Sequence, residues 1–474
     1  MIRHLCAALP CLAVTVLPSS PSLADGPALS LITAARTVVV DRYASSPGVQ
    51  LGLGAYLAAN APFEIRVKRS SYDRPIEARR RIGGREERLP PGLLKDFSGL
   101  PGFLDIRIKD PRGRTVKRIS QKFCPNGMAG RVRSDAAPVN RYPESCALHP
   151  FTLGSVWGIQ RGWAVSTLPY DAPYVDLKPG RYDVEMTVAE RYQRLLDASG
   201  ATRKVRLVVR KAREQAERRG SALSGTAQAP RERPSGTPAA PGGPRPDLRA
   251  LPAWGIRVSH ENDAGKVVKK RDYLRFAATV WNAGPSRLVV DGFRREGRDV
   301  MDAYQYFYGA DGAQKGFVKT GGFEWDPKPG HQHWHFTDFA AYRLLSADKR
   351  RVVRGQKEAF CLANTDQIDL TVPGAIWRPD NTDLSTSCGE ATSVSVRQVL
   401  EAGSGDTYES SLPGQSFDVT GLPNGVYLLE VAANPARHLV ESTFSNNVAY
   451  RRIVLGGGRG ARTVKITPVG SVRG

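Results

Sequence analysis

Three of the seven histidines in this 474-residue chain stand at alternate positions, His331, His333 and His335, within Gly-His-Gln-His-Trp-His-Phe. In an extended strand, residues i, i+2 and i+4 project from one face, so this spacing brings three imidazoles together. Imidazole suits copper, zinc, iron or nickel, and three protein ligands leave a coordination position open for water, O2 or substrate. The pattern predicts a metal site of the catalytic kind without choosing the metal, and a histidine-rich strand without metal is the alternative. The isolated histidines are interpreted as ordinary surface or core residues: His149, His260 and His438.

The residues around the triplet resemble the copper segment of the lysyl oxidase family. Residues 325–345, WDPKPGHQHWHFTDFAAYRLL, carry a Trp, the His-Gln-His-Trp-His core, an acidic and aromatic stretch and Tyr-x-Leu-Leu in the family's order. The resemblance covers roughly residues 251–455. Its other motifs are YLRFAATVWNAG (273–284), KEAFCL (357–362), GDTY (405–408), LPNGVY (422–427) and ANPARHLVESTFSNNV (433–448).

This resemblance implies a cofactor, lysine tyrosylquinone, formed from Lys357 and Tyr408 with copper and O2. Taken alone, a lysine is usually a solvated charge and a tyrosine a core or turn residue, so only the two family motifs assign these roles. A quinone carbonyl captures a primary amine, a carboxylate removes the α-proton, and hydrolysis and reoxidation by O2 give aldehyde, ammonia and H2O2. The implied function is a copper- and quinone-dependent oxidase of primary amines, peptidyl lysine among them, whose copper is held by the three triplet histidines.

Two carboxylates are candidates for the general base. Asp406 lies two residues before Tyr408 and shares its face if the segment is extended, while Asp418 lies in the next predicted strand. For either residue, a solvated turn carboxylate is the alternative interpretation.

Two other functions fit part of this pattern. The first is a non-catalytic copper-binding or cell-envelope-binding β-domain protein in which no quinone forms. The second is a metallo-oxygenase with zinc, iron or copper, which a distant carboxylate or a fourth histidine ligand would favour. The shortage of other histidines argues against the second.

The sequence also departs from the animal members of the family. They carry more cysteines, one of them directly before the first copper histidine, where this chain has Gly330. If the family's other cysteines are missing, Cys361 and Cys388 pair with each other. The animal enzymes have no counterpart of residues 31–211, and the long, two-domain layout resembles the bacterial branch.

Alternating patterns predict the elements that must position these residues. Apolar and charged residues alternate in PFEIRVKR (62–69), FLDIRIKD (103–110) and PGRYDVEMTV (179–188), and similar patterns return in DYLRFAATVWNAG (272–284) and LPNGVYLLEVAANP (422–435). Period-two alternation with Pro-Gly turns is typical of antiparallel strands in sandwiches. We therefore expect an all-β protein, with a β-sandwich over residues 31–211 and a mainly β domain over residues 249–458. No Gly-rich phosphate loop adjoins a strand and a helix, so nucleotide chemistry is not favoured.

The basic charge lies outside the second domain. Residues 251–458 hold 24 Lys and Arg against 24 Asp and Glu, whereas residues 1–250 hold 40 against 22, and the basic tail 459–474 adds four without an acid. Residues 212–248 are rich in Pro, Gly, Ala, Ser and Arg and are interpreted as a linker. The basic half favours an acidic envelope polymer over nucleic acid as a partner, and a merely solvated surface is the alternative.

The N-terminus has the features of an export signal. Arg3 and His4 precede an apolar run from Leu5 to Leu17, and Ser22-Leu23-Ala24 is a small-residue cleavage site. No later stretch is long and apolar enough to span a bilayer, so we expect residues 1–24 to be removed and the chain to be secreted. Two cysteines leave with the signal. The other four fall in one pair per domain, Cys124 with Cys146 and Cys361 with Cys388, which predicts two disulfides in an exported protein, although four cysteines allow three pairings.

Overall fold

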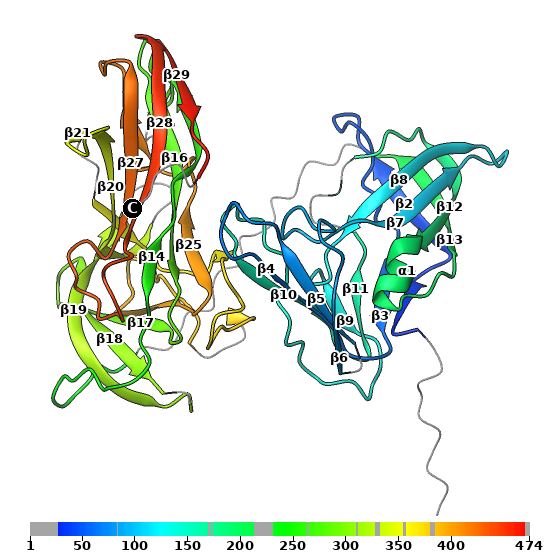
Figure 1. The fold of residues 1–474 in the computed structure, drawn as a ribbon, viewed down its shortest axis with the longest axis horizontal. Coiled ribbons are helices and arrows are strands. Elements are labelled where there is room, and N and C mark those ends of the chain that lie inside the picture. Colours follow the sequence, from blue (N-terminus) through cyan, green and yellow to red (C-terminus); the bar gives the residue numbers. More distant parts are fainter. Residues whose placement is uncertain are drawn as a thin grey trace, which may run out of the picture.

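The computed structural model of the protein describes residues 27–82, 84–168, 172, 174–212, 231–262, 265–309, 311–327, 332–353, 357–379 and 384–469. These residues form two β-rich lobes that lie side by side along the long axis of the molecule (Figure 1), one N-terminal and one C-terminal. The expected all-β fold class is confirmed, because the described residues contain 29 strands and one seven-residue helix. The predicted signal segment, 1–24, lies outside the described residues.

Three sheets build the N-terminal lobe. The five-stranded sheet has the order β2 (Thr37–Arg42), β13 (Arg203–Lys211), β12 (Gly180–Val188), β7 (Leu100–Lys109) and β8 (Thr115–Phe123). One four-stranded sheet has the order β1 (Leu29–Thr33), β3 (Ala55–Ala59), β11 (Trp163–Ser166) and β9 (Ala129–Arg131). The other has the order β10 (Gly154–Ile159), β4 (Phe63–Lys68), β5 (Glu77–Ile82) and β6 (Arg85–Arg88). Helix α1 (Glu190–Leu196) connects β12 to β13.

The alternating patterns of this lobe become the two faces of its strands. Ile106 and Ile108 of β7 and Val184 and Met186 of β12 are buried in one apolar core that all three sheets share. Their neighbours along the strands, such as Arg107, remain at the surface. Burial of one face and solvation of the other explains why period two was readable in the sequence.

Two larger sheets build the C-terminal lobe. In the first, β14 (Leu248–Ala250), β16 (Tyr273–Asn282), β25 (Ser404–Tyr408) and β23 (Asp366–Gln367) follow one another, and β15 (Trp254–Ser259) and β26 (Ser416–Asp418) also pair with β16. The second has the order β24 (Ser395–Leu400), β17 (Leu288–Arg294), β18 (Val300–Tyr308), β19 (Gln314–Asp326), β20 (His333–Ser346), β27 (Gly425–Ala433), β28 (Val448–Gly458) and β29 (Ala461–Ile466). Strands β21 (Arg351–Val353) and β22 (Lys357–Phe360) pair with β20.

The C-terminal lobe is more completely buried than its sequence pattern suggests. In β27 the alternation of Tyr427, Leu429 and Val431 with their neighbours predicts one solvated face, yet every residue from Tyr427 to Ala433 is buried. The strand lies between β20 and β28, and other chain segments cover both its faces. The sheet also continues past residue 458, because β29 pairs with β28 from Ile453↔Ile466 to Gly458↔Ala461.

Residues 231–247, in the second half of the predicted linker, lie against the C-terminal lobe. Ala239 forms a β-bridge with Phe317, and the Arg233 guanidinium contacts the Asp302 carboxylate at 2.8 Å. Residues 213–230 lie outside the described residues.

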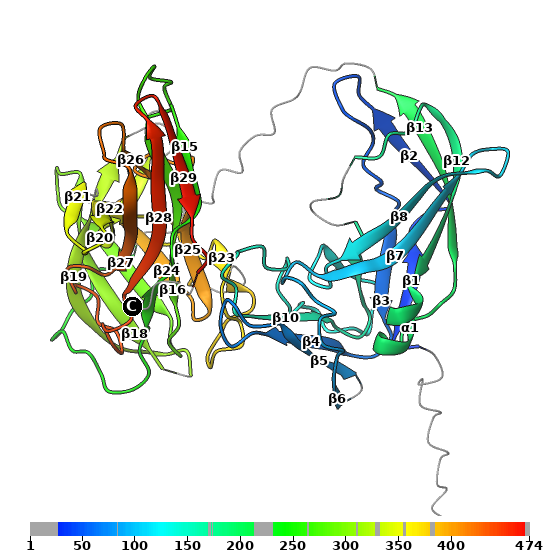
Figure 2. The same cartoon turned by 45° about the horizontal axis from the view of Figure 1, so that its top comes forward.

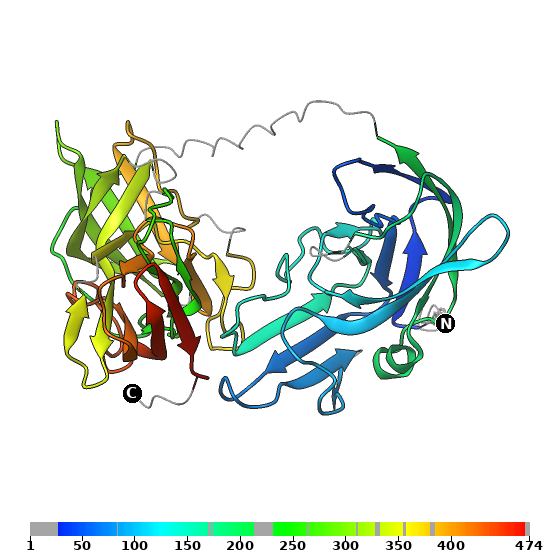
Figure 3. The same cartoon turned by 90° about the horizontal axis from the view of Figure 1, so that it is seen from above.

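The lobes meet where β10 of the N-terminal lobe approaches β23 and the segment after it, as Figures 2 and 3 show from two further directions. Gly154 and Asp369 form a parallel β-bridge, and the Leu153 N–H donates to the Ile368 carbonyl at 2.6 Å. Two apolar clusters, each with members from both lobes, cover this contact: Phe151, Leu251, Trp281 and Ile368 in one, and Tyr142, Val156 and Leu370 in the other.

Both predicted disulfides are confirmed. Cys124 bonds to Cys146 in the N-terminal lobe and Cys361 to Cys388 in the C-terminal lobe. Among the described residues there is no helix long and apolar enough to cross a membrane.

Candidate active site

Strand β20 carries two of the three triplet histidines at its beginning. The rings of His333 and His335 lie with their centroids 4.6 Å apart, as expected for residues i and i+2 on one strand face. His335 is almost fully buried, and its Nδ1 lies 3.8 Å from Oδ2 of Asp326 on the paired strand β19. His331 lies outside the described residues. Two adjacent imidazoles, one of them withdrawn from water, are a donor set that suits copper, zinc, iron or nickel.

Trp334, between the two histidines, holds the opposite face of the strand. Its side chain is fully buried, its indole N–H donates to the Glu390 carbonyl at 2.9 Å, and its backbone N–H donates to the Cys388 carbonyl at 2.9 Å. Trp334 is thus held by its side chain and by its backbone. Because side chains alternate along a strand, the imidazoles of His333 and His335 project together from the face opposite to Trp334.

Strand β22 places the predicted quinone lysine beside the histidine strand. Phe360 pairs with Phe336, the residue after His335, and Lys357 pairs with Ala341. The backbone of Lys357 is described, and its side chain lies outside the described part. The register therefore places the KEAFCL motif alongside the strand that carries the histidines.

Tyr408 contacts β22 and the residue after it from the other sheet. It ends β25, is 8% exposed, and packs its ring against Phe360 with centroids 3.9 Å apart. The Cys361 N–H donates to the Tyr408 hydroxyl at 3.0 Å. Phe360 is the cross-strand partner of Phe336, the residue after His335. The contacts with Phe360 and Cys361 therefore hold Tyr408 near the start of the histidine strand.

The disulfide between Cys361 and Cys388 joins the two halves of the site. Cys361 contacts the Tyr408 hydroxyl through its N–H, and Cys388 accepts the backbone N–H of Trp334. Gln398, which is fully buried, makes a second connection: its Nε2 donates to the Trp334 carbonyl at 2.7 Å and its Oε1 accepts the Leu362 N–H at 2.9 Å. Gln398 was not predicted from the sequence, since a lone glutamine in an apolar strand gives no signal.

The two candidate bases have different surroundings. Asp406 and Tyr408 are separated by one residue on β25 and project from the same face. The Asp406 carboxyl is 1% exposed, and burial raises its pKa well above the ordinary value, against the lowering effect of a hydrogen bond from the Ala363 N–H. The nearby Asp366 carboxylate raises this pKa further.

Asp418 lies elsewhere. It pairs with Tyr273 on β16, five residues from Ala278, which is the partner of Tyr408 on the same strand. Its half-exposed carboxylate contacts Arg271 at 2.7 Å and accepts the Thr420 N–H, and its pKa is lowered, with hydrogen bonds to Thr420 and the charge of Arg271 outweighing burial. The structure therefore brings Asp406 to the tyrosine and keeps Asp418 on an ion pair away from it.

Part of the C-terminal lobe is similar in sequence to known proteins. Residues 312–463 match the sequence profile of the lysyl oxidase family. This segment resembles the lysyl oxidase family. The protein-lysine 6-oxidase of Sus scrofa is 34% identical over 128 residues, which are 27% of this chain and 45% of that protein. The enzyme of that name from Homo sapiens is 33% identical over 27% of each chain. Lysyl oxidase homolog 2 of Mus musculus is 32% identical over 27% of this chain and 15% of its own length. The chain thus spans less than half of the relatives that it matches.

Two further lysyl oxidase-like motifs have structural roles, one beside the tyrosine strand and one in the fold. Arg275, from the YLRFAATVWNAG segment, is 2% exposed, and its guanidinium donates to the carbonyls of Ser410 at 2.6 Å, Asn262 at 3.0 Å and Leu412 at 3.2 Å. Ser410 and Leu412 lie in the turn that follows Tyr408. This buried arginine therefore fixes the C-terminal end of the tyrosine strand.

The closing lysyl oxidase-like motif is held by one buried carboxylate. Oε1 of Glu441 accepts the side-chain amides of Asn434 at 2.7 Å and Asn447 at 2.8 Å, and its Oε2 accepts the Leu248 N–H at 2.8 Å. Burial raises the pKa of Glu441 above its ordinary value, and the two amides oppose the rise. These residues join β14 to the loop between β27 and β28, so their role is to hold the fold.

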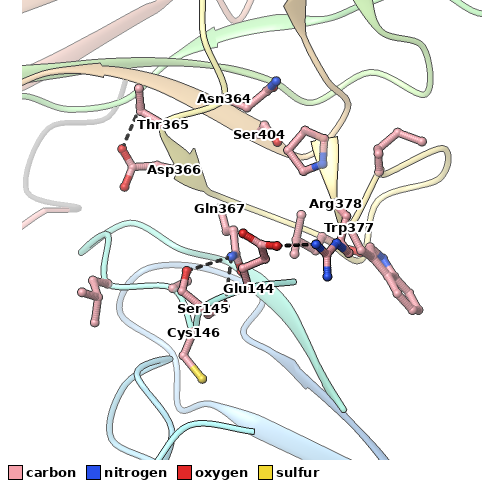
Figure 4. A pocket seen from close by; sticks show the side chains of 15 residues that line it. Glu144, Ser145, Cys146, Asn364, Thr365, Asp366, Gln367, Trp377, Arg378 and Ser404 are labelled. Carbon is pink, nitrogen blue, oxygen red and sulfur yellow. Dashed lines mark hydrogen bonds and ion pairs between the residues drawn. The ribbon is translucent and has the colours of Figure 1, made fainter. Parts of the chain in front are cut away.

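A pocket of about 340 Å³ lies between the lobes at the far end of β25 (Figure 4). The C-terminal lobe lines this pocket with Thr365, Asp366 and Gln367. The Gln367 side chain donates through Nε2 to the Ser145 carbonyl of the N-terminal lobe at 3.0 Å. Glu144 of the N-terminal lobe pairs with Arg378. Ser404, at the start of the tyrosine strand, also lines the pocket, so the N-terminal lobe lies directly beside the segment that covers β25.

Proposed function

We propose that the C-terminal lobe is a copper- and quinone-dependent oxidase of primary amines, peptidyl lysine among them. The reaction converts R-CH2-NH2, O2 and water to R-CHO, NH3 and H2O2. The observation that carries this proposal is that β22, the strand of the KEAFCL motif, pairs with the histidine strand β20 and also contacts Tyr408 through Phe360 and Cys361, although these residues come from separate segments and two sheets. The protein-lysine 6-oxidase relatives support the amine oxidase class.

His333 and His335, with His331 completing the predicted triplet, would hold the copper. When present, copper and the quinone derived from Lys357 and Tyr408 would supply the redox chemistry, with O2 as oxidant. The fit rests on the neighbouring imidazoles of His333 and His335 and on the buried position of His335. Lys357 lies on β22, which pairs with the histidine strand, opposite Ala341.

The remaining residues of the site orient the tyrosine and handle the proton. The Cys361 N–H fixes the Tyr408 hydroxyl, and the Phe360 ring covers the tyrosine ring, so rotation and access of water are both restricted. Asp406 would accept the α-proton of the amine. Burial raises its pKa, and this makes the ionised carboxylate a stronger base than an ordinary one.

The test of this proposal is release of H2O2 by the full chain after copper loading in air. We expect oxidation of a simple primary amine and of a lysine-containing peptide, and no reaction with a secondary amine of the same size. Tyr408→Phe should abolish the activity, and Tyr427→Phe, which removes a tyrosine hydroxyl bonded to the Pro423 carbonyl, should retain it. A copper-loaded wild-type chain that oxidises no amine would refute the proposal and leave a non-catalytic copper-binding domain.

Export and docking complete the proposal. We propose that residues 1–24 direct secretion and that the basic N-terminal half binds an acidic envelope polymer. Outward-facing cations on neighbouring strands, such as Arg107, Arg118 and Lys204, support docking, although Glu185 lies among them. Binding of the full chain to an acidic polysaccharide should weaken steeply with salt, and salt-independent or absent binding would contradict this part.

A further inference from the structure

A buried histidine of the N-terminal lobe contacts the C-terminal sheet. His149 precedes β10, is 5% exposed, and its Nε2 lies 2.9 Å from the Thr279 hydroxyl on β16. The Phe151 N–H donates to Nδ1 at 3.1 Å, so Nδ1 is the acceptor and Nε2 carries the proton that Thr279 accepts. The rings of Trp254 and Phe151 lie against the imidazole at 5.1 and 5.9 Å between centroids. The histidine therefore has one tautomer and one orientation.

This contact continues to the residue next to Tyr408. The Thr279 hydroxyl accepts from His149 and, at 3.3 Å, from the Trp254 indole N–H, so its own proton is directed to the Thr407 hydroxyl at 2.8 Å. Thr279 and Thr407 are also cross-strand partners in the β16–β25 pair. A single directed chain of hydrogen bonds thus runs from the N-terminal lobe to β25.

The direction from which His149 acts is set by the strand. Side chains alternate along β25, so Thr407 projects from the face opposite to Asp406 and Tyr408. On the segment that pairs with the edge of β25, the Thr365 hydroxyl accepts the Thr407 N–H at 2.8 Å, and the Thr365 N–H donates to the Gly405 carbonyl at 3.0 Å. The tyrosine strand is consequently held along its edge by its own domain and from behind by the other lobe.

We propose that the N-terminal lobe is part of the working amine oxidase and that His149 is a positioning residue for Tyr408, acting through the hydroxyls of Thr279 and Thr407. This inference rests on the proposed role of Tyr408 as the quinone precursor. The backbone bridge between Gly154 and Asp369 and the two shared apolar clusters keep His149 in place, so the lobe contributes a fixed contact to β25. It gives residues 31–211 a function in the reaction that is separate from envelope docking.

The experiment compares five full-length variants with the wild-type chain, three of which change one histidine. His149→Leu removes the donor, and His149→Gln retains an N–H donor near the position of Nε2. His260→Leu is the matched control, because His260 is half exposed and contacts the carbonyl of Arg271, which precedes β16, whereas Tyr408 pairs with Ala278 further along that strand. For each, we would measure the rate of phenylhydrazine-reactive quinone formation after copper loading in air, and kcat and KM for a primary amine.

We expect His149→Leu to slow quinone formation and lower kcat about tenfold with KM unchanged, which corresponds to the loss of about one hydrogen bond from the chain that positions Tyr408. His149→Gln should recover most of both rates, and His260→Leu should match the wild type. Thr279→Val removes the hydroxyl that joins His149 to Thr407, and it should lower both rates as much as His149→Leu does. The double variant should then be no slower than either single one, because both break the same chain.

Each other outcome overturns the inference. His149→Leu with wild-type rates, a defect that Gln does not relieve, or additive losses in the double variant would each show that the hydrogen-bond chain does not position the tyrosine. A wild-type chain that never forms the quinone is distinguishable from these results, since it refutes the proposed function and this inference with it. Thr279→Val keeps the test valid if His149→Leu does not fold.

Discussion

The two disulfides allow structural and catalytic contributions to be separated. Cys361 and Cys388 are 27 residues apart and Cys124 and Cys146 are 22 apart. Restriction of the unfolded chain by loops of these lengths gives about 3.5 and about 3.4 kcal/mol, respectively. Removing either disulfide as a double Cys→Ser change should therefore lower the free energy of unfolding of its own lobe by a similar amount.

Activity should respond differently. Cys361 donates its N–H to the Tyr408 hydroxyl and Cys388 accepts the Trp334 N–H. The Cys124–Cys146 bond joins two segments of the N-terminal lobe, where the Gly154–Asp369 bridge and the shared apolar clusters also hold the segment of His149. Loss of the Cys361–Cys388 bond should reduce quinone formation and kcat at least tenfold, because the tyrosine hydroxyl and the histidine strand lose their common anchor. Loss of the other bond should leave both within about twofold in the fraction that remains folded.

The assay combines urea unfolding with phenylhydrazine titration and H2O2 release, at a temperature at which both variants are folded. Equal losses of activity in the two variants would refute the assignment of Cys361–Cys388 to the site, since they would follow stability alone. An unchanged rate in the Cys361→Ser/Cys388→Ser variant would refute it as well.

Three further predictions follow from particular buried groups. Asp406→Asn should retain the quinone and lower kcat by about 10²- to 10⁴-fold, which is the range for loss of a general base. Kinetics with phenylhydrazine titration would check this prediction, and an unaffected kcat would exclude Asp406 as the base. Burial and the charge of Arg69 lower the pKa of His149 to about 4, against the opposite effect of Asp366, so stability present above about pH 6.5 should be lost as the pH falls toward 4, by up to about 3 kcal/mol. Urea unfolding between pH 4 and 7.5 should show this slope in the wild type and a shallower one in His149→Gln; identical slopes would contradict it. Gly154→Ala should weaken the contact between the lobes, since a Cβ there would overlap the Asp369 carboxylate, whereas Gly52→Ala, with open space around it, should not. Limited proteolysis at the boundary between the lobes would distinguish the two variants, and equal cleavage would contradict the contact between the lobes described above.

The sequence alone predicts the parts of the fold and site that follow from local pattern. Period two gave the all-β class, because strands such as β7 and β12 bury one face and expose the other. The triplet spacing predicted a shared strand face, which β20 supplies for His333 and His335. The even cysteine pair in each domain predicted the two disulfides.

What the sequence could not predict depends on contacts between distant segments. Nothing local distinguishes Asp406 from Asp418, and only the fold buries one carboxylate beside Tyr408 and places the other on Arg271. Gln398 is similar, since its connection of Trp334 to Leu362 needs three segments to meet. His149 was interpreted as an ordinary residue, because its partner Thr279 is 130 positions away in the sequence.

We propose above that Lys357 and Tyr408 become one cofactor in this chain. The most direct test of this proposal is peptide mapping of the copper-loaded, air-incubated protein, with absorbance and mass recorded with and without phenylhydrazine. We expect a single coloured species in which the peptides of Lys357 and Tyr408 are joined. Its absorption should shift with the hydrazine, and it should be missing from Lys357→Ala and Tyr408→Phe. Two separate, colourless peptides from a wild-type chain that has bound copper would contradict it.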